Sequence, residues 1–109
     1  PDCRPEFNLD ASNAVYASSD GKVTLVAPFA YSSKADIALL AIRNDFDLSE
    51  TWSCYKGGEI HCGRCGTCVE RLEAIAAAVQ THYHNTGNAY LDLTKYEDDS
   101  FWKTQVEEK

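Results

Sequence analysis

Four cysteines lie within one short segment, Ser53–Arg71, and they constrain the fold more than any other feature of the sequence. Cys54, Cys62, Cys65 and Cys68 follow the spacing C-x7-C-x2-C-x2-C. A C-x2-C pair can place both sulfurs on one tetrahedral ion, because the turn between them is tight. A glycine follows each of the two middle cysteines, where a positive φ lets backbone N–H groups point at sulfur. The spacing therefore predicts a structural zinc site with four sulfur ligands and no open position.

Other interpretations of the same thiols stay open. An iron–sulfur cluster could use the four thiolates, although this is not a ferredoxin spacing. Two disulfides or bare thiols are the third alternative, but cysteines this close are poorly placed to pair with good geometry. His61 could replace one sulfur, or it could be a solvent-facing loop histidine. His82 and His84 are two positions apart and cannot share a helical face, so we expect both to face solvent.

Composition limits the classes of function. At 109 residues the chain is at most one small domain, and its net charge of -7 argues against a nucleic-acid backbone as the main partner. No apolar run approaches ~20 residues, so no membrane span is predicted. Clustered rather than dispersed cysteines favour a metal in a reducing compartment over a disulfide framework. The chain starts at Pro1 and contains no methionine, so we expect it to be a piece of a longer protein.

Local patterns predict a mostly helical chain with one short strand. Pro5 suits the first position of a helix, and the β-branched run Val23–Ala27 predicts a strand that Pro28 ends. A second helix is predicted from Ser33, a capping residue, to about Asn44. Its residues are almost all apolar, which is typical of a helix buried on several sides, either in the core of this chain or against a missing domain.

A third helix is predicted from about Thr67 to Thr81. Leu72, Ile75, Ala76 and Val79 give it an apolar face, and residues 85–88 break it. The acidic end, Asp98–Lys109, is expected to be exposed and to hold a short helix.

Several segments together resemble one enzyme family. Pro1–Phe7 (PDCRPEF), Ala27–Ala41 (APFAYSSKADIALLA), Glu50–Arg71 (ETWSCYKGGEIHCGRCGTCVER) and Asp92–Tyr96 (DLTKY) occur in the order of the C-terminal half of the 7-cyano-7-deazaguanine synthase family. The resemblance covers most of residues 1–75 and then weakens. It implies an α/β fold, the C-terminal portion of a Rossmann-like adenine nucleotide alpha-hydrolase-like (PP-loop) architecture whose N-terminal ATP-binding part is absent here.

The resemblance also implies an activity. The family enzyme is an ATP-dependent ligase that converts 7-carboxy-7-deazaguanine and ammonia to 7-cyano-7-deazaguanine, in the pathway to a modified tRNA base. Residues 1–109 would be one zinc-bearing C-terminal fragment. Alone, this fragment would have no ligase activity and would bind ATP weakly or not at all. We expect a cytoplasmic protein with small-molecule substrates and no direct nucleic-acid or membrane contact, and a homodimer is compatible with this reading.

Residue by residue, Cys54, Cys62, Cys65 and Cys68 fall on the family's zinc ligands. Asp2 and Arg4 fall on its P-D-C-R loop and Lys34 on its S/T-K-x-E motif, which makes them candidates for substrate or phosphate contacts; no catalytic residue is assigned. The alternatives are an Arg4 that pairs with Glu6 or solvent and a Lys34 that is simply exposed. Cys3 is expected to be a small loop or buried residue.

The sequence leaves two alternative functions for this chain. The first is the zinc-bearing portion of the ligase, and the second is a stand-alone zinc module that docks a partner protein. A Ser-Gly-Gly-x-Asp-Ser motif encoded upstream of Pro1 would favour the ligase, and a start codon just before Pro1 the module.

Overall fold

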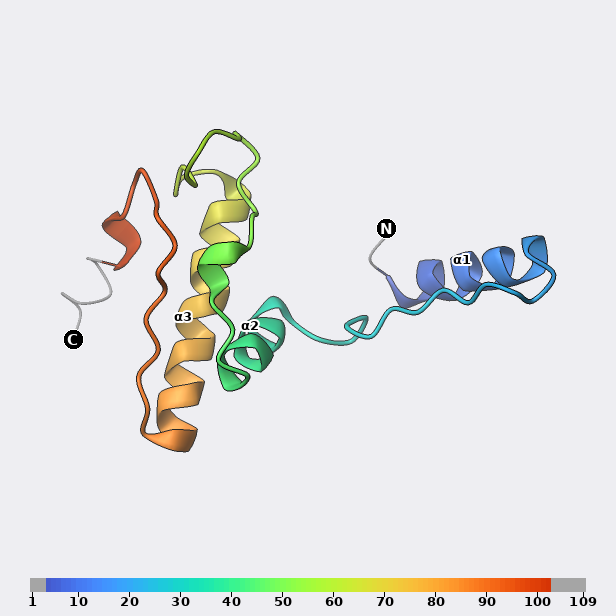
Figure 1. Ribbon diagram of the computed structural model, residues 1–109, viewed down its shortest axis with the longest axis horizontal. Coiled ribbons are helices and arrows are strands. Elements are labelled where there is room, and N and C mark those ends of the chain that lie inside the picture. Colours follow the sequence, from blue (N-terminus) through green and yellow to red (C-terminus); the bar gives the residue numbers. More distant parts are fainter. Residues whose placement is uncertain (1–3, 103–109) are drawn as a thin grey trace. The chain divides into compact units, whose positions relative to one another are not determined.

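The computed structural model describes residues 4–102, and the chain divides into two compact units, Pro1–Ser33 and Lys34–Lys109. Figure 1 labels the helices of both units. Helices account for about half of the chain, as the sequence predicts. None of the helices within residues 4–102 is both long enough and apolar enough to span a bilayer.

The first unit is built around α1 (Pro5–Ser18). Pro5 opens the helix, and Arg4 precedes it in an extended conformation, with φ -82° and ψ 147°. The position of Pro5 was predicted, since proline fits the first helical turn, and proline also forces the residue before it out of the helical region. No residue of α1 is buried.

The predicted strand at Val23–Ala27 does not form. The segment is extended, but it belongs to no ladder within residues 4–102, and its side chains are exposed. Its main chain makes few bonds: Ser12 Oγ donates to the Leu25 carbonyl at 3.3 Å, and Val23 N donates to Ser19 Oγ at 3.0 Å. A strand exists only where a second strand supplies the other half of each hydrogen bond, so β-propensity alone cannot make one.

The second unit packs α2 (Lys34–Arg43) against α3 (Gly66–Thr86). The start and end of α2 agree with the prediction to within one residue. Its expected burial on several sides is not found: Ala38 and Ile42 are buried, whereas Ile37 and Leu40 are 37% and 45% exposed. One neighbouring helix covers only one side of an all-round apolar helix, so the opposite side stays open.

The core lies between these helices and the loop that joins them. Five side chains are buried together: Ala38, Ile42, Leu48, Ile75 and Ala78. The short helix η1 (Leu48–Glu50) brings Leu48 into this core, and the Asp47 carboxylate caps it by accepting from Ser49 N at 2.9 Å. The apolar face predicted for the third helix is therefore confirmed where it contributes Ile75.

Helix α3 is longer than predicted and ends at Gly87. The expected end was near Thr81 with a break at residues 85–88; the helix continues to Thr86 and stops within that predicted break. Gly87 then adopts φ 75°, a left-handed conformation that glycine tolerates, and its N–H bonds to the Tyr83 carbonyl at 2.8 Å.

From Gly87 the chain turns and runs back along α3 towards the cysteine loop (Figure 1). The Tyr90 hydroxyl accepts from Leu48 N at 3.2 Å and donates to the Phe46 carbonyl at 3.0 Å, which fixes the start of this return. A parallel bridge joins Tyr96 to His61 at its far end. A helix begins at residue 100, as expected for the acidic end, but the expected exposure is not found throughout: Asp98, Phe101 and Trp102 are half-buried, and Trp102 packs against the core. Residues 103–109 lie outside the described residues.

Candidate metal centre

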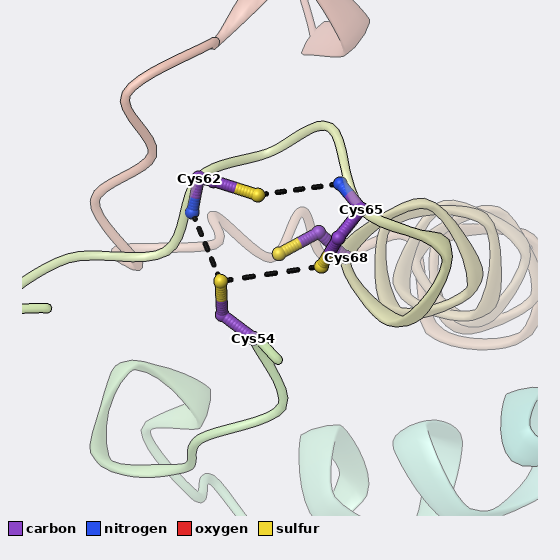
Figure 2. A group of neighbouring side chains, drawn as sticks. All are labelled: Cys54, Cys62, Cys65 and Cys68. Atoms are coloured by element: carbon purple, nitrogen blue, oxygen red, sulfur yellow. Dashed lines mark hydrogen bonds between the residues drawn. The ribbon is translucent and has the colours of Figure 1, made fainter. Parts of the chain in front are cut away.

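The fold brings the sulfurs of Cys54, Cys62, Cys65 and Cys68 within 4.8 Å of one another. Figure 2 shows the four side chains pointing toward a common centre, three from the loop and one from α3. Cys54, Cys62 and Cys68 are buried, and Cys65 is half-buried. The four residues that the spacing selects are thus the four that the structure gathers.

Local geometry explains this convergence. Cys65 is the residue before α3, and Cys68 lies in the first turn of the helix. Gly63 has φ 78°, which turns the chain back sharply between Cys62 and Cys65. The positive φ expected at Gly66 is not found, because Gly66 is the first residue of α3. The tight turn and the helix start together place three sulfurs on one side, and the long loop from Cys54 returns the fourth.

Main-chain N–H groups donate hydrogen bonds to two of the four sulfurs. Cys62 N donates to Cys54 Sγ at 3.4 Å, while the N–H groups of Arg64 and Cys65 both donate to Cys62 Sγ, at 3.3 and 3.2 Å. Figure 2 marks two of these bonds. Donors directed at sulfur stabilise the thiolate, which is the form that binds metals.

The thiols differ in acidity. A hydrogen bond from Thr67, helped by main-chain donors, lowers the pKa of Cys65 to about 5, and the Cys62 main chain lowers the pKa of Cys54. Burial raises the pKa of Cys68 to about 12. Burial therefore opposes the charged form of Cys68, which a metal ion bound by the four sulfurs would favour.

The donor set fits a tetrahedral metal ion. Zn–S bonds of about 2.3 Å at tetrahedral angles place sulfurs about 3.8 Å apart, and Cys65 Sγ lies 4.0 Å from Cys54 Sγ. Four soft sulfur donors without an oxygen ligand match zinc rather than magnesium or calcium. The four cysteines could hold a metal ion of this kind.

His61 is neither a solvent-facing residue nor a member of the sulfur cluster, so both interpretations of it are wrong. It is buried, with its ring 4.3 Å from that of Trp52 and 5.6 Å from that of Tyr96. Burial is the main reason that its pKa is lowered, so the ring is neutral at pH 7. The aromatic neighbours enclose it because the bridge to Tyr96 closes over this part of the loop.

The other candidate residues lie apart from the sulfurs. Asp2 and Cys3 lie outside the described residues, and Arg4 is exposed at the start of α1. Lys34, the first residue of α2, forms an ion pair with Glu70 of α3, and both side chains are more than half exposed. His84 is exposed as predicted, but His82 is half-buried because α3 continues past it.

Arg71 is the residue that the sequence analysis missed. Its guanidinium donates to four oxygens: those of Tyr96 (3.1 Å), Thr51 (2.8 Å), the Leu48 carbonyl (2.6 Å) and Thr94 (2.8 Å). The Tyr96 hydroxyl in turn donates to Asp92 at 2.7 Å. The alternating pattern Asp92-Leu93-Thr94-Lys95-Tyr96 was a usable signal, because it places three polar side chains on one side of an extended segment.

A mostly apolar pocket of about 380 Å³ adjoins Arg71. Ser53 lines it with a buried hydroxyl that makes no hydrogen bond within the described part of the chain. Lys34, one of the candidate substrate contacts, lines the same pocket as Arg71. The remaining lining comes from α2, α3 and the joining loop: Ile37, Ala38, Ala41, Phe46, Leu48, Thr51, Ala74 and Ile75.

Comparison with known proteins gives consistent matches. Residues 1–79 match the family model described as "Queuosine biosynthesis protein QueC". A 7-cyano-7-deazaguanine synthase of Paracoccus denitrificans is 45% identical over all of this chain and 43% of its own length, and one of Rhizobium rhizogenes is 50% identical over 95% of this chain and 41% of its own.

A third relative, the 7-cyano-7-deazaguanine synthase of Desulfotalea psychrophila, is 47% identical over 88% of this chain and 39% of its own length. The chain thus spans less than half the length of these curated relatives, and it matches their C-terminal portion. No match to a solved structure was found.

Proposed function

The chain belongs to the QueC family of queuosine biosynthesis proteins, and on that premise we propose that it is the zinc-bearing portion of a 7-cyano-7-deazaguanine synthase. The supporting observation is identity of 45–50% to synthases over nearly the whole chain, together with the four gathered cysteines. The complete protein would be a cytoplasmic ATP-dependent ligase acting on 7-carboxy-7-deazaguanine and ammonia.

In the proposed reaction, adenylation activates the substrate carboxylate, ammonia displaces the adenylate to give an amide, and a second activation dehydrates the amide to the nitrile. The part of the relatives that this chain does not span would bind ATP. The zinc would supply no chemistry, since four sulfurs leave no open coordination position for a substrate. Its role would be to hold the loop between η1 and α3 in one conformation.

The proposed substrate contacts are Asp2, Arg4 and Lys34. The Arg4 guanidinium is exposed, and its planar fork suits a carboxylate or a phosphate. Lys34 would have to leave Glu70 to reach an anion. That exchange is cheap, because exposed ion pairs contribute about 0–1 kcal/mol.

Residues 23–27 form no ladder within the described part of the chain, which leaves their main chain available to a neighbouring strand and supports the proposed Rossmann-like architecture. Its apolar run is typical of a strand that is covered on both faces in a parallel sheet. We propose that the remaining portion of the synthase supplies the neighbouring strand. The strand expected from the sequence would then form in the complete protein.

A second candidate function is a zinc module that docks a partner protein. The exposed apolar side chains Ile37, Leu40 and Phe46, at 37%, 45% and 44%, favour it, because such residues mark interaction surfaces when they adjoin one another. A Ser-Gly-Gly-x-Asp-Ser motif upstream in the gene would identify the ligase instead.

The activity is tested with the complete protein that carries this chain. Purified protein, 7-carboxy-7-deazaguanine, ATP and ammonium are incubated, and 7-cyano-7-deazaguanine and AMP are quantified by mass spectrometry. We expect both products, and neither without ATP. A complete, folded, zinc-loaded protein that forms no nitrile would contradict the proposal and leave the docking module.

Arg4→Lys in the complete protein is expected to lower kcat/KM about tenfold or more, equivalent to about 1.4 kcal/mol of transition-state binding. The lysine keeps the charge but loses the bidentate fork. Arg43→Lys, at the exposed end of α2, is the matched control and should leave the kinetics unchanged. Wild-type kinetics for Arg4→Lys would show that Arg4 is only a surface residue.

A further inference from the structure

Residues 92–98 lie beyond the match to the family model, which ends at residue 79, yet they contact the cysteine loop directly. Three main-chain bonds join the two segments: His61 N to the Lys95 carbonyl (3.3 Å), Glu97 N to the His61 carbonyl (2.8 Å) and Asp98 N to the Cys62 carbonyl (3.1 Å). The last of these reaches a residue of the sulfur cluster. The segment is therefore part of the wall of the metal centre.

Gly63 shows how close this contact is. A Cβ atom at Gly63 would lie 2.2 Å from the Asp98 carbonyl oxygen, so the absence of a side chain there is what lets the segment approach. On the other side, Glu97 accepts from Arg64 at 3.3 Å in an exposed ion pair. The segment is thus seated against the turn between Cys62 and Cys65.

Arg71 holds the same segment from α3. We call its contacts the Arg71 clamp: the guanidinium, the Leu48 carbonyl, the hydroxyls of Thr51, Thr94 and Tyr96, and the Asp92 carboxylate behind Tyr96. These partners come from two separate stretches of chain, residues 48–51 and 92–96, and Arg71 joins both to α3. Four charge-assisted bonds from one planar group impose a geometry that a lysine, with a single donor atom, cannot reproduce.

The clamp and the cysteine loop are joined through Tyr96. Its hydroxyl accepts from Arg71 and donates to Asp92, and burial is the main reason that its pKa is raised to about 12, so this donor persists at physiological pH. The centroid of the Tyr96 ring lies 5.6 Å from that of His61, the residue before Cys62, and the two rings are tilted by 54°. Arg71 thereby reaches the cluster without touching a sulfur.

We propose that Arg71 is a positioning residue of the metal centre: by clamping residues 92–98 onto the loop at residues 61–63, it makes release of the metal depend on undocking of this segment. This inference rests on the proposed zinc at the four cysteines. Metal and segment then stabilise each other, because each holds the loop in the conformation that the other binds.

The first test measures zinc release from the full chain into excess chelator. Arg71→Lys is expected to speed release at least tenfold and Tyr96→Phe several-fold, with unchanged far-ultraviolet circular dichroism. Arg43→Lys is the matched control: it is the same substitution at the exposed end of α2, a residue that is no part of the clamp or of the docked segment, so release should stay within twofold of the wild type.

If Arg71→Lys does not fold, Tyr96→Phe serves as the test, because it removes only the hydroxyl that bonds to Arg71 and Asp92. Zinc release within twofold of the wild type in a folded clamp variant would overturn the proposal and leave the proposed zinc site intact. Absence of zinc from the wild-type chain would overturn both.

Amide hydrogen exchange of the zinc-loaded proteins gives a direct readout of whether the segment is docked. Arg71→Lys is expected to speed exchange of the Glu97 and Asp98 amides, which bond to the loop carbonyls of His61 and Cys62, at least tenfold relative to the wild type. The Gly87 amide, bonded to Tyr83 at the far end of α3, is the internal control and should change little. Equal protection of Glu97 and Asp98 in the two zinc-loaded proteins would show that Arg71 does not hold the segment on the loop.

Discussion

Cys68→Ser is expected to abolish tight zinc binding and the cooperative unfolding transition of the second unit. Cys68 is fully buried, and its sulfur lies where α3 begins. A structural zinc contributes on the order of 10 kcal/mol of folding free energy, comparable to the whole stability of a small domain. A core of five buried residues cannot replace that contribution.

The measurement is zinc content by mass spectrometry together with thermal unfolding followed by circular dichroism. Cys3→Ser is the matched control, because it makes the same substitution at the one cysteine outside the four-cysteine motif, and it should keep both the metal and the transition. A Cys68→Ser protein with stoichiometric zinc and wild-type unfolding would contradict the role assigned to the cluster.

Gly63→Ala is expected to destabilise the zinc-loaded chain by roughly 2–4 kcal/mol. Two costs add at this position: φ 78° is strained for alanine, and the new Cβ would lie 2.2 Å from the Asp98 carbonyl oxygen. The alanine can fit only if residues 96–98 move away from the loop. Urea unfolding of the zinc-loaded protein measures the loss.

Substitutions at two other glycines distinguish the cost of backbone strain from the cost of the close contact with Asp98. Gly58 has φ 94° but open space around it, so Gly58→Ala should cost only the backbone strain, roughly 1–2 kcal/mol. Gly66 opens α3 with neither constraint, so Gly66→Ala should be neutral or slightly stabilising. If Gly63→Ala proves no worse than Gly58→Ala, the close approach of Asp98 does not contribute to stability.

What the sequence predicts well here depends on local chemistry. The spacing of the cysteines and their glycines is encoded within one short segment, and the structure gathers those four thiols. The start of α1 was predicted because proline and its neighbour are restricted by sterics alone, and the start of α2 because Ser33 is a capping residue. The apolar face of α3 followed from its period, and its end lies within the predicted break at residues 85–88, although the helix was expected to stop near Thr81.

What the sequence does not predict depends on residues far apart in the chain. The burial of His61 requires Tyr96, and the environment of Arg71 requires Leu48 and Thr94. The alternation at residues 92–96 indicates that one side of that segment is polar, but it does not indicate which distant residues the segment contacts. The strand at residues 23–27 fails for the same kind of reason: the propensity is local, but the partner strand must come from elsewhere.

The most direct test of the account is the metal itself. Elemental analysis combined with X-ray absorption at the zinc edge, on protein purified without added metal, should show one zinc per chain with four sulfur neighbours at about 2.3 Å and no nitrogen or oxygen ligand. Iron with visible absorption, a shell that includes nitrogen from His61, or a disulfide at Cys54 would contradict it.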